Sequence, residues 1–154
     1  MVVYVRDIYS KRIRTIEADL TLKDAAKMMN NMGISCLIVV KDGSAVGILT
    51  ERDMMRSIML DLVNLHKLQV KTFMSTNIIT VQENASVEEA IRLMVGYKIK
   101  KLPVTGALGD GTALIGMLSM TDIVTRFPEL ESRFSQPEDH KAELNNFPYL
   151  AVKN

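Results

Sequence analysis

The first helix predicted from the hydrophobic pattern follows Thr21. Thr21 and Asp24 have the spacing of a capping box, in which a hydroxyl and a carboxylate bind the first backbone N–H groups of a helix. Gly33 is placed to end this helix as its C-cap. Between the caps, the apolar positions recur at the spacing of one helical face: Leu22, Ala25, Ala26 and Met29.

Short apolar runs around this helix predict strands. The predicted extended segments are 12–16, 36–40 and 45–49, and a hairpin turn at 41–44 joins the last two. Thr50 follows as the N-cap of a second helix that reaches about residue 65. The order of elements is therefore β-α-β-β-α.

The same pattern occurs a second time. When the sequence is shifted by 65 positions, Val5 falls on Val70; later the shift becomes 69, so that Gly47 falls on Gly116. The second copy predicts an extended piece at 78–81, a helix capped by Ser86 with Glu89, strands at 101–105 and 113–118, and a last helix that is capped by Ser119 and ended by Pro128. The apolar face of its first helix is Val87, Ala90, Ile91 and Met94.

The repeat predicts an α/β (α+β) fold made of two β-α-β-β-α units. The predicted boundaries are 1–66 for the first unit, 67–127 for the second and 128–154 for a C-terminal tail. A unit of about 60 residues is only marginally stable alone, so we expect the two units to pack together.

Each copy closes with the motif Gly-x-x-Thr/Ser-x-x-Asp, and two interpretations of the motif are open. A hydroxyl and an Asp at this spacing form a capping box, with no role beyond the helix start. A helix start after a strand also suits an anion, since its N–H groups and the hydroxyl can bind phosphate and the Asp can accept from ribose hydroxyls. The motif residues are Gly47, Thr50 and Asp53, and then Gly116, Ser119 and Asp122.

The two units and their doubled motif resemble a tandem pair of CBS (cystathionine β-synthase) domains, which is called a Bateman module. The segments 70–75 and 99–104 are similar to that family too, and the resemblance covers about 5–126. It implies pseudo-two-fold packing and a cleft for up to two adenosine-type ligands (AMP, ADP, ATP or S-adenosylmethionine). It also implies a homodimer that signals to an effector protein and is not an enzyme.

The resemblance implies one ligand site in each copy. In the first site Thr50 and Arg52 face the phosphate and Asp53 the ribose, while Ile13, Arg14, Ile34 and Ser35 line the base. In the second site the motif residues are Ser119, Thr121 and Asp122, the base is lined by Ile78, Ile79, Ile99 and Lys100, and Lys101 is near the phosphate. Arg14 stands where the second copy has the apolar Ile79, and it either crowds an adenine base or offers it a cation–π partner; of the two sites, the second is favoured for adenine.

Composition limits the other classes of protein. Of 154 residues, 47% are hydrophobic and 24% charged, with a net charge of +1, which is ordinary for a soluble protein and gives no support to nucleic acid or an anionic membrane as partner. No apolar run approaches the ~20 residues of a membrane helix, and the start of the chain does not read as a secretory leader, so we expect a cytoplasmic protein. The single cysteine, Cys36, allows no internal disulfide and is expected in the core.

The sequence gives little support to metal binding or catalysis. His66 and His140 have no Cys or His neighbour at ligand spacing, so no metal site is expected. No nucleophile–base pair can be assembled, so we expect neither an enzyme nor a required cofactor. Methionines at 28, 29 and 32 are expected in the core, and those at 54, 55 and 59 at an interface between modules.

Three functions therefore remain in the order of their support. The first is a sensor of adenosine-type ligands. The second is a structural dimerisation or docking module whose cleft is empty. The third, and weakest, is nucleic-acid binding by the lysines at 98, 100 and 101.

Overall fold

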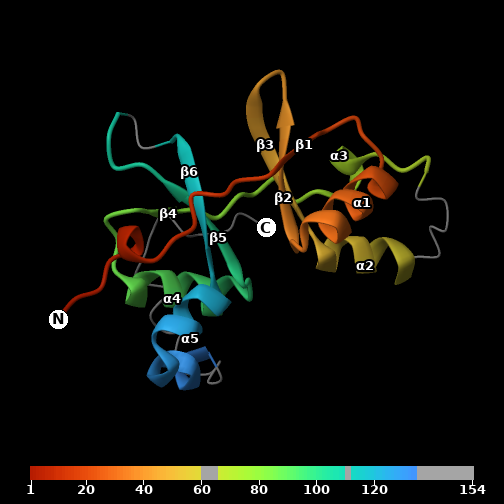
Figure 1. Ribbon diagram of the computed structural model, residues 1–154. Helices are drawn as coiled ribbons and strands as arrows, with labels where there is room; N and C mark the ends of the chain where they lie inside the picture. Colours follow the sequence, from red (N-terminus) through yellow and green to blue (C-terminus); the bar gives the residue numbers. More distant parts are fainter. Residues whose placement is uncertain (60–65, 110–111, 135–154) are drawn as a thin grey trace. The chain divides into compact units, whose positions relative to one another are not determined.

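The computed structural model describes residues 1–59, 66–109 and 112–134 (Figure 1). It divides into two compact units. We call Ile13–Ile78 the first-copy unit, and Met1–Arg12 together with Ile79–Asn154 the second-copy unit. Each unit has its own sheet and its own hydrophobic core, which confirms the predicted fold class.

The first-copy unit is built around a three-stranded sheet. Its strands are β1 (Thr15–Glu17), β2 (Cys36–Lys41) and β3 (Ser44–Thr50), in the order β1-β2-β3, and its helices are α1 (Leu22–Met32), α2 (Glu51–Met59) and α3 (Val70–Phe73). β1 runs parallel to β2, and β2 antiparallel to β3. The β2–β3 turn has Asp42 and Gly43 at φ 52° and 78°, the left-handed conformation that a two-residue hairpin turn needs.

The helical face predicted for α1 forms the core of this unit. Leu22, Ala25 and Met29 are buried, together with residues of β2 and β3. Met32 is an exception, because it was expected in the core and is 48% exposed. α1 ends at Met32 and the chain turns away at Gly33, so no further helical turn covers this side chain.

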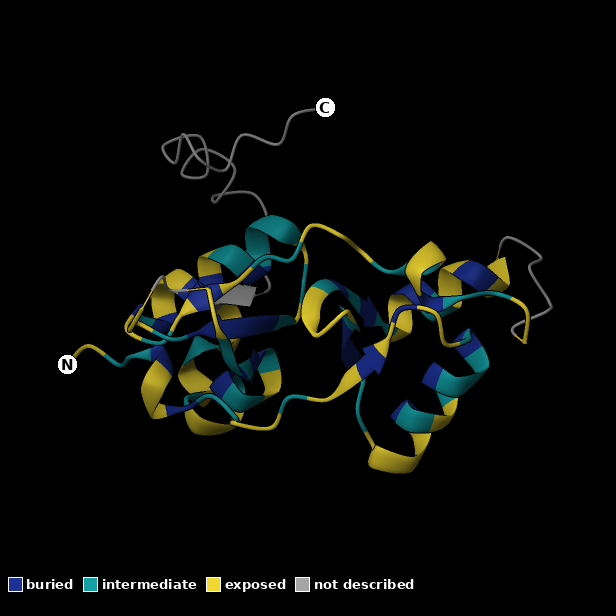
Figure 2. Ribbon diagram, turned by 90° about the horizontal axis from the view of Figure 1, so that it is seen from above, coloured by how far each residue is buried: buried dark blue, intermediate teal, exposed yellow. Residues whose placement is uncertain are grey.

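The second-copy unit repeats this arrangement. Its strands are β4 (Val81–Gln82), β5 (Lys101–Thr105) and β6 (Leu114–Ser119), in the order β4-β5-β6, and its helices are α4 (Val87–Tyr97), α5 (Met120–Arg126) and the short η1 (Val5–Asp7) and η2 (Pro128–Phe134). The predicted face of α4 is buried at all four positions. Figure 2 shows such buried positions in dark blue along the strands and on one side of the helices.

Several predicted boundaries differ from the observed ones by a few residues. β1 and β4 begin at Thr15 and Val81, three residues later than predicted, where the paired register with β2 and β5 begins. Pro128 ends α5 as predicted, and it starts η2. The predicted extension of α2 to about residue 65 and most of the tail, 135–154, lie outside the described residues.

The segments that precede the two copies are exchanged between them. Val5 donates its N–H to the carbonyl of Ala85 at 2.9 Å, and Val70 donates to the carbonyl of Leu20 at 2.8 Å. Residues 1–12 therefore belong to the second-copy unit and 67–78 to the first. The compact units are defined by contacts in space and include the exchanged segments, whereas the predicted boundaries 1–66 and 67–127 follow the sequence repeat and stay a prediction.

Within the described residues, no helix combines the length and the apolar character that crossing a membrane requires.

Candidate functional site

The first motif forms a closed cap at the start of α2. The Thr50 N–H and the Thr50 hydroxyl both donate to Asp53 Oδ2, at 2.8 and 2.9 Å, and the Asp53 N–H faces Thr50 Oγ1 at 3.4 Å. Asp53 is only 9% exposed. A carboxylate is therefore held in a fixed orientation at the point where β3 passes into the helix.

The second motif has the same geometry at the start of α5. The Ser119 N–H and hydroxyl donate to Asp122 Oδ2 at 2.9 and 2.6 Å, and the Asp122 N–H donates to Ser119 Oγ at 3.0 Å. Ser119 is buried, and Asp122 is half-buried. In both motifs the cap uses Oδ2, so the other carboxylate oxygen, Oδ1, takes no part in it.

The cap geometry alone does not distinguish a ligand site from a structural helix start. Thr21 and Asp24 make the same contacts at the start of α1, at 3.0, 2.7 and 3.2 Å. Hydrogen bonds from the Thr21 hydroxyl and N–H lower the pKa of Asp24. The capping interpretation is therefore confirmed for these boxes, and any ligand role is additional to it.

The predicted box at Ser86 is only half formed. The Glu89 N–H donates to Ser86 Oγ at 3.1 Å, but the Glu89 carboxylate does not complete the box. Glu89 is exposed and has a longer side chain than the Asp of the other boxes.

The other residues predicted for the first site meet at the same end of the sheet. Ser35 accepts the N–H of Glu51 at 3.0 Å, which ties the 34–35 loop to the first residue of α2. Arg14 accepts the N–H of Ile38 at 2.9 Å, and Cys36 is the register partner of Thr50. The backbone around Arg14 and Ser35 is thereby connected through β2 to the Thr50 cap.

The side chains around this cap differ in exposure. Arg14 and Arg52 are exposed, Ile13 and Ser35 are half-buried, and Ile34 packs against the core of the first-copy unit. Because the base was expected to lie against Ile34, its part in the core leaves only the exposed portion of that side chain for a ligand.

Backbone contacts of the same kind are found among the residues predicted for the second site. Lys100 accepts the N–H of Met120 at 2.9 Å, and Lys101 is the register partner of Ser119. Ile79 and Ile99 pack against the core of the second-copy unit, and Thr121 is exposed. Ile78, which was predicted for the same site, is the last residue of the first-copy unit.

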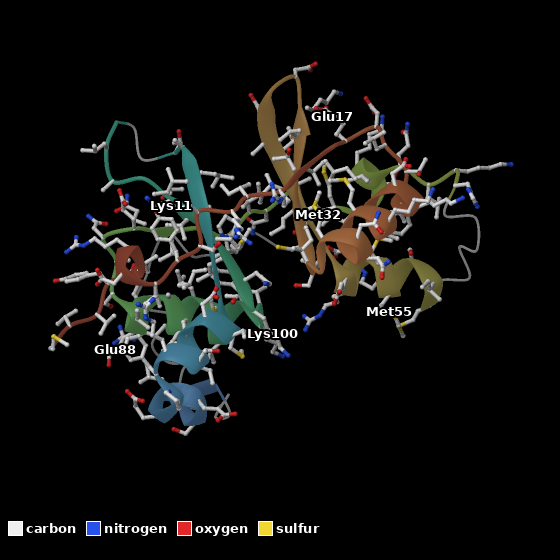
Figure 3. All side chains as sticks on the ribbon, in the orientation of Figure 1. Lys11, Glu17, Met32, Met55, Glu88 and Lys100 are labelled. Atoms are coloured by element: carbon white, nitrogen blue, oxygen red, sulfur yellow. The ribbon has the colours of Figure 1, made fainter. Side chains whose placement is uncertain are left out.

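The two sites differ in charge. Directly opposed residues of an antiparallel pair carry their side chains on the same face, so Lys101 stands beside Ser119. At the corresponding place in the first-copy unit, the buried Cys36 stands beside Thr50. The exposed side chain of Lys100 is labelled in Figure 3 near the start of β5.

The glycine of each motif has a packing role that the sequence pattern does not show. A Cβ on Gly47 would lie 2.6 Å from Met74 Sδ and 2.8 Å from the carbonyl oxygen of Ser75. A Cβ on Gly116 would meet the ring of Tyr9 and lie 2.5 Å from the carbonyl oxygen of Ser10. Both glycines therefore allow an exchanged segment to approach the motif strand.

The described part of the chain holds no group of three or more His, Cys, Asp or Glu side chains that could bind a metal ion. His66 is exposed, and His140 lies outside the described residues.

Comparison with known proteins agrees with the repeated unit. The family model described as "CBS domain" matches residues 5–60 and again 70–129. A CBS domain-containing protein of Dictyostelium discoideum is 34% identical over 136 residues, which are 80% of this chain and 90% of that protein. Inosine-5'-monophosphate dehydrogenase of Thermoplasma acidophilum is 33% identical over 129 residues, which are 82% of this chain but only 24% of the dehydrogenase.

A solved structure shows the same fold with ligands. The CBS domain pair of protein MJ0100, crystallised in complex with 5'-methylthioadenosine and S-adenosyl-L-methionine, is 26% identical with a TM-score of 0.73, and the match covers 85% of this chain and all of that one. Two family matches, two sheets of equal topology and a doubled motif thus lead to one conclusion: this chain belongs to the CBS domain family and contains a tandem pair of CBS domains.

Proposed function

We propose that this chain is a regulatory module that binds adenosine-type ligands (AMP, ADP, ATP or S-adenosylmethionine) at the Thr50–Asp53 and Ser119–Asp122 motifs. The observation that carries the proposal is the position of the two motif caps, which unlike the Thr21 cap stand where a strand passes directly into a helix, β3 into α2 and β6 into α5, with Oδ1 of each Asp outside the cap. The adenosine ligands bound by a related CBS domain pair support it.

The motif supplies the groups that an adenosine ligand needs. An ionised carboxylate only accepts hydrogen bonds, so Oδ1 of Asp53 suits the two neighbouring hydroxyls of a ribose. Thr50 now donates its hydroxyl hydrogen to Asp53. To bind a phosphate oxygen, that hydrogen would turn to the ligand, while the Thr50 N–H keeps Asp53 in place at 2.8 Å.

The charge beside each motif favours different ligands. Lys101 places a cation next to Ser119, which suits the phosphates of a nucleotide and disfavours the positively charged sulfonium of S-adenosylmethionine. We therefore assign a phosphorylated ligand to the second site. The exposed Arg14 and Arg52 are the cations of the first site.

The module acts through other proteins and not by catalysis of its own, and it needs no cofactor. Exposed apolar side chains on α2 support a protein contact, here a homodimer or an effector: Met55, Ile58 and Met59 are 56%, 54% and 79% exposed. Met55 is labelled on α2 in Figure 3. The proposal includes neither a membrane nor a nucleic acid as a partner, and it places the module in the cytoplasm.

A second candidate is a ligand-free docking module. It is favoured by the observation that Thr21 and Asp24 form the same cap at α1, where the resemblance places no ligand. In that case Asp53 and Asp122 only cap the starts of α2 and α5.

Substitution of each Asp by Asn separates the two candidates. Asn can accept the Thr50 or Ser119 hydrogen bonds through its amide oxygen, but it places an NH₂ donor at the second position, where ribose hydroxyls need an acceptor. We expect AMP, ATP or S-adenosylmethionine to bind the purified, nucleotide-free protein in isothermal titration, and to lose affinity about tenfold or more in Asp53→Asn or Asp122→Asn. Asp24→Asn is the matched control and should bind normally.

Absence of binding by all three probes to the folded wild-type protein would reject the sensor and favour the docking module. Equal binding by the wild type and both motif variants would show that ligands bind elsewhere.

A further inference from the structure

We infer that an exposed apolar face of α2 binds the C-terminal tail of this chain, residues 135–154. We call the side chains of Met55, Ile58 and Met59 the α2 face. The inference does not depend on ligand binding, and it names the occupant of a surface that a homodimer or an effector could also use. A partner that uses the α2 face must displace the tail, so the tail controls access to it.

The first step is that the α2 face is one continuous surface. Its residues are spaced by three and four positions, which places them on the same side of a helix. More than half of each of the three residues is exposed, whereas Asp53 and Ser57 on the other side of α2 are buried. Adjacent exposed apolar side chains of this kind mark an interaction site more often than scattered ones do.

The second step compares the two copies. With the shift of 69 positions, Met55 and Ile58 correspond to Val124 and Phe127. Both residues of the second copy are half-buried, and Phe127 packs with Leu130 of η2 against the core of the second-copy unit. The chain that follows α5 therefore covers this position in the second copy, whereas Met55 and Ile58 stay exposed among the described residues of the first.

The third step is the size of the α2 face. A stable interface between two folded proteins buries about 800 Å² on each partner and involves about 20 residues a side. The described part of α2 has nine residues, and three of them form the face. A surface of this size suits a short segment that inserts a few apolar side chains better than it suits the body of another folded protein.

The tail contains a segment with the required apolar character. The match to the CBS family model ends at residue 129, so residues 135–154 are an addition to the two domains. Residues 147–152 read Phe-Pro-Tyr-Leu-Ala-Val and form a run without a charged residue. This run is the part of the tail that we assign to the α2 face.

Charge complementarity favours the same assignment. Arg56 is exposed on α2, three positions before Met59, and it makes no ion pair with another described residue. The tail carries three acidic residues ahead of its apolar run: Glu138, Asp139 and Glu143. A tail whose apolar run lies on the α2 face can therefore place a carboxylate near the Arg56 guanidinium.

The tail is long enough for this contact. Residues 135–146, which precede the apolar run, span about 40 Å when extended, whereas a compact unit of this size is about 28 Å across. The run can therefore reach past the unit from which the tail starts, or reach a second copy of the chain. The inference requires no particular arrangement of the two units.

The test uses the methionines of the α2 face as reporters. Hydrogen peroxide oxidises accessible methionine sulfurs, and mass spectrometry of the whole chain gives a rate for each. Met32, which is 48% exposed at the end of α1 in the same unit, is the internal reference, and Figure 3 labels it together with Met55. The anchor variant combines Phe147→Ser with Leu150→Ser, and the matched control combines Asn145→Ser with Asn146→Ser.

We expect Met55 and Met59 to be oxidised about threefold faster in the anchor variant than in the wild type, because a tail that is bound about two thirds of the time leaves them accessible for the remaining third. Met32 should react equally in all proteins, and the control variant should behave like the wild type. Unchanged rates at Met55 and Met59, a rise that includes Met32, or an equal rise in the control variant overturns the inference. Protection that persists in the anchor variant and grows with protein concentration also overturns it, since a second folded copy then covers the face.

A second measurement locates the tail directly. A nitroxide can be attached to Asn146→Cys alone, because the native Cys36 is buried. It should broaden the ¹³C-methyl NMR signals of Met55 and Met59 and leave that of Met32 sharp, and a lack of broadening at Met55 and Met59 overturns the inference.

A mixture of nitroxide-labelled and ¹³C-labelled chains then identifies the source of the tail. Broadening that persists between different chains shows the tail of a second copy, and broadening that disappears shows the tail of the same chain; both results support the inference. None of these measurements uses a ligand, so their failure leaves the proposed sensor function untouched.

Discussion

Val5 donates its backbone N–H to the carbonyl of Ala85 at 2.9 Å, across 80 residues of chain. In the first-copy unit the same contact joins Val70 to Leu20, and both valine side chains are 0% exposed. The first buried residue of each sequence repeat thus completes the core of the other repeat. Each repeat thus contributes its first segment to the core of the other repeat.

The position of Val5 in the core of the second-copy unit predicts which unit a substitution at Val5 destabilises. Val5→Ala removes two buried methyl groups and should lower the free energy of unfolding by about 2 kcal/mol. The loss should appear in the second-copy unit, although Val5 is near the N-terminus, and hydrogen exchange should show faster opening of β5 and β6 amides. Urea denaturation provides the free energy.

Val2→Ala is the control for this prediction, because Val2 is 61% exposed and should have almost no effect. If Val5→Ala speeds hydrogen exchange only at β2 and β3 amides, Val5 does not belong to the core of the second-copy unit.

The register of β5 and β6 predicts ligand selectivity. Lys101 stands beside Ser119, so Lys101→Ala should weaken ATP binding at the second site about tenfold, and less at high salt, where the charge is already screened. S-adenosylmethionine, which has no phosphate, should bind the variant as well as or better than the wild type. Titrations at two salt concentrations in an Asp53→Asn background test this.

The exposed Lys27 on α1 offers a matched control, since Lys27→Ala removes the same charge far along the chain from Ser119. If both variants weaken ATP binding equally, the effect is a general one of net charge and not of Lys101 at the site. No weakening by Lys101→Ala would remove this lysine from the proposed site.

The cap of α1 predicts a pH dependence of stability. The hydrogen bonds from Thr21 hold the pKa of Asp24 below its ordinary value of 3.8, so the folded state favours the ionised carboxylate. This contribution is complete above the unfolded pKa and is lost as pH falls through the lower folded pKa. Urea midpoints measured from neutral to acidic pH should therefore fall less steeply with acid in Asp24→Asn than in the wild type.

Asp42→Asn is a suitable control for this experiment, because Asp42 is an exposed residue of the β2–β3 turn. An acid-induced loss of stability that is identical in the wild type and in Asp24→Asn would show that the cap does not contribute to it.

The local elements could be predicted from the sequence because their causes lie within a few residues of one another. The Thr21 and Ser119 caps, the buried face of α4 and the Gly43 hairpin turn depend on spacings of two to four positions, and all agree with the structure. Two local predictions are exceptions: Met32 is exposed, which depends on where the helix ends relative to the core, and the box at Ser86 is only half formed. The site residues were predicted from the doubled motif and its resemblance, and the structure brings Ser35 next to α2 and Lys101 next to Ser119.

The sequence by itself thus determined the repeated β-α-β-β-α unit, most of the helix caps and the apolar faces of α1 and α4. Only the tertiary structure decided that residues 1–12 complete the second-copy unit, that Gly47 and Gly116 make room for exchanged segments, and which cation stands beside which motif. The physical reason is that these features depend on backbone hydrogen bonds and close contacts between residues tens of positions apart. Helical periodicity and helix caps depend on residues that are neighbours in the sequence. Which distant segment a backbone group pairs with depends on the surfaces that the folded chain brings together.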